Sequence, residues 1–241
     1  QQLEDYIEKM TSGYDLFINF MIFSRLISRA PKSIYLCMFP PKTQYQETQG
    51  NIIKKLKAKY YDYSFMRSYT KFIIISQYSN HWFQNFWGKT KKSVIVYSPV
   101  FTVGNLLQRY DESKKTNIII SVGRFFVGSH SKKQLEMVEF FTSNADIFCD
   151  YEYHLVGAVS NYLEDIKYLE KIKEIALTNK NIFVHENCKY EELIKLYEKA
   201  KIFWHATGLG INGDLEPEKM EHFGITTVEA MSYGVVPVVI N

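Results

Sequence analysis

The sequence predicts an α/β protein with two parallel sheets, and three observations lead to this class. Short apolar runs of five or six residues alternate with longer amphipathic segments, as in βαβ units whose strands are buried on both faces. This alternation breaks at a polar stretch near residues 104–117 and then starts again. Charge also divides the chain: residues 1–110 carry 15 Lys/Arg and 6 Asp/Glu, whereas residues 111–241 carry 14 and 20.

The first half predicts a sheet that follows one probable helix. Apolar runs predict strands at residues 15–20 ("DLFINF"), 32–39 ("KSIYLCMF"), 71–76 ("KFIIIS") and 93–99 ("SVIVYSP"). The aromatic segment 80–88 ("NHWFQNFWG") predicts a helix between the last two strands.

The second half predicts regular strand–helix pairs. The expected strands are residues 118–123, 153–159, 181–186, 201–206 and 235–240, and the expected helices are 132–141, 162–177, 190–200 and 226–234. We therefore divide the chain into residues 1–103 and 104–241. No covering helix follows the last strand and only one precedes the first, so we expect both domains to be incomplete, as in a fragment of a longer enzyme.

Composition excludes several classes of protein. Hydrophobic residues make up 46% and charged residues 23%, as in a soluble globular protein, and no apolar run is long enough to span a membrane. Neither a signal peptide nor a C-x-x-C pair is present, so we expect a cytoplasmic protein. We find no metal-ligand spacing, no serine nucleophile motif and no G-x-G-x-x-G, and expect neither a metal nor a nucleic-acid partner.

The loop after the strand at 118–123 carries candidate anion ligands. Gly123 ends the strand, Arg124 follows, and Lys132 and Lys133 open the next predicted helix. Arginine binds two phosphate oxygens and lysine adds a point charge, so these side chains suit a diphosphate. Taken alone, ordinary basic surface residues explain the loop equally well.

The segment "EHFGITTVEAM" predicts a second anion site. Gly224 suits a turn, and Thr226 or Thr227 is a candidate N-cap of a helix whose free N–H groups attract anions. Glu229, near the helix start, can accept hydrogen bonds from ribose hydroxyls, and Glu221 from sugar hydroxyls. Taken singly, Glu229 is better explained by complementation of the helix dipole, and Glu221 by simple exposure to solvent.

Together these motifs resemble the retaining glycosyltransferases of family 4, which have the two-domain GT-B fold with Rossmann-like domains. Glu221 and Glu229 fit the family's pattern of two glutamates separated by seven residues. The strings "HFGITTVEAMSYGVVPVVIN", "SVGRFF" and "SQYSNHWFQNFWG" are close to the branch that contains the lipid-linked-oligosaccharide alpha-1,2-mannosyltransferase and its bacterial relatives. The likeness is weaker before residue 70.

This resemblance implies a metal-independent hexosyltransferase that moves a sugar from a nucleotide-diphosphate sugar, with GDP-mannose as one candidate, to a glycan or lipid-linked acceptor. No cofactor is implied beyond that donor. It places Arg124 and Lys132 on the diphosphate, with Lys133 as the alternative lysine, because two extra residues separate Arg and Lys compared with many members. It also implies that Glu221 contacts the sugar. The remaining implied donor contacts are Gly123, His185 beside the base, Gly224, Ile225, Thr226 and Glu229 on the ribose.

Two departures from the family pattern limit this assignment. The early glycine-rich loop is absent, and Met38 of "CMFP" stands where many members have a histidine near the acceptor. A non-catalytic sugar-nucleotide-binding fragment is one alternative. A GT-B sugar-nucleotide epimerase is another, which the Arg/Lys pair fits less well. His205 and His222 lie near the proposed crevice, either touching ligand or packing.

The basic first half also suggests peripheral contact with the inner face of a membrane. The helix at 80–88 carries Trp82, Phe83, Phe86 and Trp87, and Lys89, Lys91 and Lys92 follow. Aromatic rings beside lysines suit an anionic headgroup region, provided that at least two of the rings are exposed. Packing of all four in a core would exclude this contact.

Overall fold

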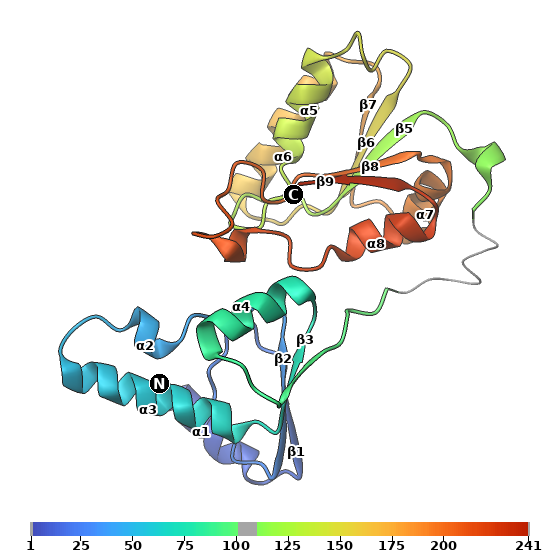
Figure 1. Ribbon diagram of the computed structural model, residues 1–241. Helices are drawn as coiled ribbons and strands as arrows, with labels where there is room; N and C mark the ends of the chain where they lie inside the picture. The colour runs from blue at the N-terminus through green and yellow to red at the C-terminus, as the bar shows by residue number, and fades with distance from the viewer. Residues whose placement is uncertain (1, 101–109, 241) are drawn as a thin grey trace. The chain divides into compact units, whose positions relative to one another are not determined.

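The computed structural model describes residues 2–100 and 110–240. The chain forms two compact units, Gln1–Ser98 and Pro99–Asn241, each with its own parallel sheet and covering helices (Figure 1). The predicted α/β class with two parallel sheets is therefore confirmed. The domain boundary expected between residues 103 and 104 lies outside the described residues, as does the first part of the expected linker, residues 104–109.

The first unit contains a four-stranded parallel sheet in the order β1-β2-β3-β4. All four strands were expected and are slightly shorter than the apolar runs that predict them: β1 (Leu16–Asn19), β2 (Lys32–Cys37), β3 (Lys71–Ile74) and β4 (Ser93–Ile95). The helices are α1 (Gln2–Thr11), α2 (Gln44–Glu47), α3 (Ile52–Ser68) and α4 (Gln77–Trp87).

Aromatic side chains fill the core of the first unit. Alternate residues of β2 and β3, among them Tyr35 and Phe72, point to the same face of the sheet and are buried there. They pack against Phe65 of α3 and Phe83 of α4, with Tyr35 and Phe65 ring centroids 5.5 Å apart in an edge-on arrangement. Rings of this size bury large apolar areas, so a few of them hold a small sheet to its helices.

The aromatic residues of α4 do not form the exposed patch that membrane contact through this helix requires. Phe83 is buried, and Trp87 packs on Phe65 and donates a hydrogen bond from Nε1 to the carbonyl of Pro41 at 2.8 Å. Trp82 and Phe86 are half-buried and pack on each other. None of the four is exposed, so that expectation was wrong for this segment, since the rings serve helix packing instead.

The long helix α3 was not expected from the sequence. Asn51 caps it by accepting the backbone N–H of Lys54 at 3.1 Å, and only one side of the helix packs inward, through Ala58, Asp62 and Phe65. The Asp62 carboxylate accepts the backbone N–H groups of Gln44 and Tyr45, both at 2.8 Å, and so holds the start of α2 against α3.

The second unit contains a five-stranded parallel sheet in the order β7-β6-β5-β8-β9. The predicted strand–helix alternation is confirmed throughout. The elements are β5 (Ile118–Val122), α5 (Gln134–Ser143), β6 (Glu152–Gly157), α6 (Leu163–Ala176), β7 (Ile182–Glu186), α7 (Tyr190–Lys199), β8 (Ile202–His205), α8 (Ile225–Ser232) and β9 (Val236–Val239), with short 3-10 turns at Glu112–Lys114 and Pro217–Lys219.

Helices cover both faces of this sheet, as Figure 1 shows. Ile119 of β5 points toward α5 and α6, where it packs with Val138 and Ile172. Its neighbour Ile120 points to the other face and packs with Tyr197 of α7 and Ala230 of α8. A strand that is apolar on both sides therefore forms the centre of a doubly wound sheet.

Two adjacent strands approach each other closely where they end. The backbone N–H of Gly123 donates to the carbonyl of Val156 at 2.9 Å, across the pair β5–β6. A Cβ atom added at Gly157 would lie 2.0 Å from the carbonyl oxygen of Gly123. Only glycine therefore fits at position 157, and the turn that begins at Gly123 can lie directly against the end of β6.

Candidate functional site

The candidate site lies at the carboxyl ends of β5 and β8. The chain continues from β5 to β6 on one side of the sheet centre, while β8 pairs with β5 on the other side. In open parallel sheets, a crevice for ligands forms where the strand order reverses in this way. The predicted loops after Gly123 and after Ala206 both leave the sheet at this edge.

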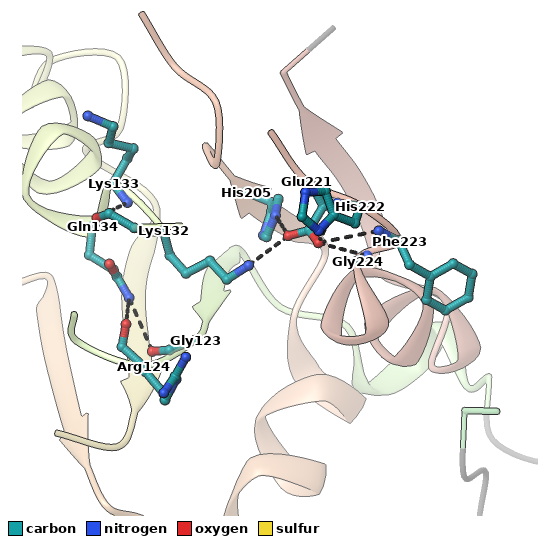
Figure 2. Close-up of polar contacts among 11 residues, drawn as sticks. Gly123, Arg124, Lys132, Lys133, Gln134, His205, Glu221, His222, Phe223 and Gly224 are labelled. Carbon is teal, nitrogen blue, oxygen red and sulfur yellow. Dashed lines mark hydrogen bonds and ion pairs between the residues drawn. The ribbon is translucent and has the colours of Figure 1, made fainter. Parts of the chain in front are cut away.

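Glu221 is the centre of a polar cluster in this crevice (Figure 2). One carboxylate oxygen, Oε2, lies 2.6 Å from Nζ of Lys132 and 2.7 Å from Nε2 of His205. The other oxygen, Oε1, accepts the backbone N–H groups of His222, Phe223 and Gly224 at 3.1, 3.4 and 3.1 Å. The sequence predicted Lys132, Glu221 and Gly224 as neighbours of a ligand, and the structure brings them together through Glu221.

The surroundings of Glu221 keep it ionised. Burial alone would raise the pKa of this carboxyl, but the hydrogen bond from His205 and the ammonium of Lys132 outweigh burial, and the pKa falls well below its usual range. The carboxylate therefore remains charged at neutral pH and holds the Lys132 ammonium at a fixed place beside the start of α8.

Lys132 and Lys133 have different partners, although the sequence expects both at a helix start. The helix α5 begins at Gln134, and Lys133 is its N-cap with a left-handed backbone, φ 59°. Lys133 forms an ion pair with Glu136 at 2.9 Å, whereas the stem of Lys132 passes over Gly123 and its ammonium reaches Glu221. Figure 2 shows the two side chains pointing in different directions. Only Lys132 lies in the Glu221 cluster.

The turn after β5 is fixed by Gln134, which sequence reasoning missed as a site residue. Its buried side-chain amide donates to the carbonyls of Gly123 and Arg124 at 3.1 and 3.0 Å. Arg124 is exposed, and its guanidinium lies over the ring of Phe126, 5.2 Å from the centroid. The backbone of Arg124 is thus held while its cationic head stays accessible.

The helix α8 begins one residue earlier than expected, and Gly224 is its N-cap in place of Thr226 or Thr227. Gly224 has φ 76°, a left-handed conformation that suits glycine. Gly224 has no side chain that could cap the helix, and Glu221 accepts the N–H of Gly224 itself. The first N–H groups of the helix, on Ile225 and Thr226, have no partner within the helix itself.

Glu229 lies in the second turn of α8 and contacts α7. Its oxygens accept the hydroxyls of Tyr190 at 2.7 Å and Tyr197 at 3.2 Å. Tyr197 is buried, so the carboxylate is held from the protein side. Sequence reasoning missed both tyrosines, since helix spacing predicts them only as part of an amphipathic helix.

His185 lies apart from the Glu221 cluster, near the end of β7. Its Nε2 lies 2.9 Å from Nδ1 of His154 on β6, and the two rings stack with centroids 5.1 Å apart. Burial lowers the pKa of both histidines, so the pair is favoured in its neutral form.

His130 and His222 pack edge to face beside the cluster, with ring centroids 4.6 Å apart. Burial, followed by the neighbouring His130, lowers the pKa of His222 to about 4, although the Glu221 carboxylate opposes this shift. His222 is therefore neutral at pH 7 in the folded chain. Its contact with His130, 92 positions earlier in the chain, was not predicted from the sequence.

We expect the stability of the folded chain to fall as pH decreases from about 6.5 toward 4. Within this range an unfolded histidine binds a proton that folded His222 does not, so the free energy of unfolding drops by up to about 1.4 kcal/mol per pH unit for this group. Urea unfolding at several pH values measures how the free energy of unfolding changes with pH, and we expect this slope to be shallower in His222→Gln than in the wild type. His81→Gln, at an exposed position, serves as the control, and equal slopes in all three proteins would contradict the assignment.

Residues 2–100 and 110–240 contain no group of three or more His, Cys, Asp or Glu side chains that could hold a metal ion. No helix in the same part of the chain is long and apolar enough to cross a bilayer.

Comparison with known families matches residues 105–241 to the family described as glycosyl transferases group 1. A curated relative, the GDP-Man:Man(3)GlcNAc(2)-PP-Dol alpha-1,2-mannosyltransferase of Kluyveromyces lactis, is 28% identical over 202 residues. That alignment covers 76% of this chain and 33% of the yeast protein, so the chain spans about a third of the relative's length.

Solved structures with the same fold match nearly the whole chain. The pneumococcal O-GlcNAc transferase GtfA, in complex with UDP and GlcNAc, has a TM-score of 0.59 at 16% identity over 99% of this chain and 44% of that protein. Anabaena Alr3699/HepE, with UDP and glucose, has a TM-score of 0.59 at 12% identity, covering 99% and 62%. A trehalose-6-phosphate synthase has a TM-score of 0.62 at 9% identity, also covering 99% and 62%.

Proposed function

Because the chain belongs to the group 1 glycosyl transferases and has the GT-B fold, we propose that it transfers a sugar from a nucleotide-diphosphate sugar with retention of anomeric configuration. The first unit takes the role of the acceptor-side domain, and the second binds the donor. The acceptor is a glycan or a lipid-linked glycan. The K. lactis relative, whose name specifies GDP-Man, supports GDP-mannose as the donor to test first.

One observation carries this proposal: Lys132 and the start of α8 meet at Glu221, in the crevice between β5 and β8. The ammonium and the helix N-terminus both favour negative charge, while Glu221 fixes both in place. Such an arrangement suits the diphosphate of a nucleotide sugar, with Arg124 adding a second cation from the end of β5.

These groups act mainly on the leaving group. As the bond between the anomeric carbon and the phosphate oxygen lengthens, negative charge grows on the diphosphate and positive charge on the sugar ring. Cations and N–H groups that are already in position stabilise the diphosphate charge without reorganising. The leaving phosphate oxygen takes the proton of the acceptor hydroxyl, so the chemistry requires no base from the described loops. Glu221 contacts the sugar hydroxyls, Glu229 the ribose, and His185 lies beside the base.

We expect Arg124→Ala to slow transfer by about a hundredfold in the intact enzyme, because one preorganised cation is lost from the leaving group. The exposed guanidinium has no ion pair among the described residues, so its removal should leave the fold unchanged. The measurement is turnover of candidate donors beside nucleotide affinity by calorimetry. A rate within a few-fold of wild type would refute the diphosphate role. If the wild type binds the donor but transfers no sugar, the chain is a sugar-nucleotide-binding protein instead of an enzyme.

We expect Glu229→Ala to weaken nucleotide binding by about 1–3 kcal/mol, the range for a lost charge-assisted hydrogen bond. Tyr197→Phe is the matched control, since it removes a partner of Glu229 inside the protein but keeps the carboxylate. Calorimetry with the nucleoside diphosphate should show a large loss of affinity for Glu229→Ala and a smaller loss for Tyr197→Phe. Unchanged affinity in Glu229→Ala would contradict a ribose contact.

A further inference from the structure

The helix α3 exposes a stripe of large apolar side chains to solvent. Its members and their exposed fractions are Ile52 71%, Ile53 60%, Leu56 59%, Tyr60 73% and Tyr63 57%. At about 100° per residue these five positions fall within an arc of about 100° on the helix surface. The residues that pack into the first unit, Ala58, Asp62 and Phe65, lie on the opposite side. The apolar stripe is therefore separate from the core-facing side of the helix.

Basic side chains border this stripe. Lys57 lies about 40° beyond one edge of the arc and Lys59 about 20° beyond the other, while Arg67 falls within it. Lys55 lies about 60° beyond the edge that Lys59 borders, whereas Lys54, about 150° from the middle of the stripe, lies outside this border. None of these four lysines takes part in an ion pair with another described residue. Their long stems can lie along an apolar surface while the ammonium groups remain at its polar boundary.

No acidic residue of α3 balances these charges at the surface. Asp62 is the one acid in Ile52–Ser68, and it is buried with both oxygens on backbone N–H groups of α2. Burial, followed by the α1 acids Glu8, Glu4 and Asp5, raises the pKa of Tyr61, which lies about 130° from the middle of the stripe. The exposed face of the helix thus combines apolar side chains with positive charge only.

We propose that α3 is an interfacial helix that lies on an anionic lipid surface, with the apolar stripe in the headgroup region and the bordering lysines on lipid phosphates. Apolar area and positive charge on one helix face are the two contributions that hold such helices at a bilayer. A protein groove would also accept an apolar stripe, but a border of unpaired cations on both sides favours a surface with many negative charges.

The experiment is flotation of the intact protein with phosphatidylcholine vesicles, with and without phosphatidylglycerol, at low and high salt. We expect binding only to the anionic vesicles, and weaker binding as salt screens the charges. Lys57→Gln/Lys59→Gln should lower the partition coefficient by about 30-fold, since each basic residue near the surface contributes about fivefold. Leu56→Ser/Tyr60→Ser should lower it by about tenfold or more.

Matched controls come from α6 in the second unit. Lys167→Gln/Lys171→Gln makes the same change in net charge at exposed positions, and Leu163→Ser/Leu177→Ser removes two exposed apolar side chains. Both should bind vesicles as the wild type does. Equal binding to neutral vesicles, or equal losses in the control variants, would overturn the proposal. So would concentration-dependent dimerisation that Leu56→Ser/Tyr60→Ser abolishes, or capture of a protein partner without vesicle binding. None of these readouts requires turnover, so failure here is distinct from failure of the proposed reaction.

Discussion

Replacement of Lys132 by alanine is expected to slow sugar transfer by about two to three orders of magnitude. The ammonium lies 2.6 Å from Glu221, and the carboxylate and the Lys132 stem over Gly123 hold it in place before any ligand arrives. A preorganised charge at this position stabilises the departing diphosphate at little cost in reorganisation, which is why its loss falls mainly on the rate. Steady-state kinetics should show a fall in kcat much larger than the change in KM.

Lys133→Ala is the matched control for this experiment. The neighbouring lysine carries the same charge, but its ammonium pairs with Glu136 on the surface of α5. We expect the transfer rate of Lys133→Ala to change less than about fivefold, since ion pairs at the surface contribute little. Lys132→Arg should restore part of the rate. If Lys133→Ala proves the slower variant, the lysine assignment is reversed.

The second large effect is on stability. Gly157→Ala is expected to lower the free energy of unfolding by about 3 kcal/mol, because the new methyl group would meet a backbone carbonyl that cannot move alone. The added carbon would lie 2.0 Å from the oxygen of Gly123, and relief of that overlap separates β5 from β6. The turn that carries Arg124 would move with it. Urea unfolding followed by circular dichroism measures the loss.

Gly213→Ala provides the control in the same unit. A Cβ at that position would make ordinary contacts with Met220 at 3.4 Å and beyond, at a backbone conformation open to alanine. We expect its unfolding midpoint to stay close to that of the wild type. A Gly157→Ala protein with the wild-type midpoint would show that the two strand ends are not packed as described.

The sequence was sufficient to locate nearly every strand because a parallel strand buried on both faces is an uninterrupted apolar run. It failed at α3 for a physical reason. That helix places apolar residues on two opposite sides, Phe65 toward the core and Leu56 toward solvent, so the periodic signal of an amphipathic helix cancels. The aromatic helix α4 was found, but the sequence left open whether its rings are exposed or packed, and Phe83 and Trp87 pack against other elements.

The sequence predicted which residues would gather near the ends of the strands, because the loops that follow parallel strands meet at one edge of the sheet. It did not predict their partners. Whether Lys132 or Lys133 joins the Glu221 cluster depends on the left-handed backbone at Lys133. This conformation is uncommon for lysine, and no residue pattern in the sequence predicts it. The helix cap was misassigned because the left-handed backbone at Gly224 starts the helix before either threonine, without a side-chain cap.

The pairing of β5 with β8 also determines when the crevice can exist. The hydroxyl of Ser121 donates to the carbonyl of Trp204, a partner 83 residues further along the chain, whereas its contact with Tyr153 spans 32 residues. A ribosome that has produced β5, β6 and β7 has thus made only one wall of the crevice. A molecule that needs both walls cannot stabilise the nascent unit at that stage, and its binding contributes only after synthesis has passed β8 and α8.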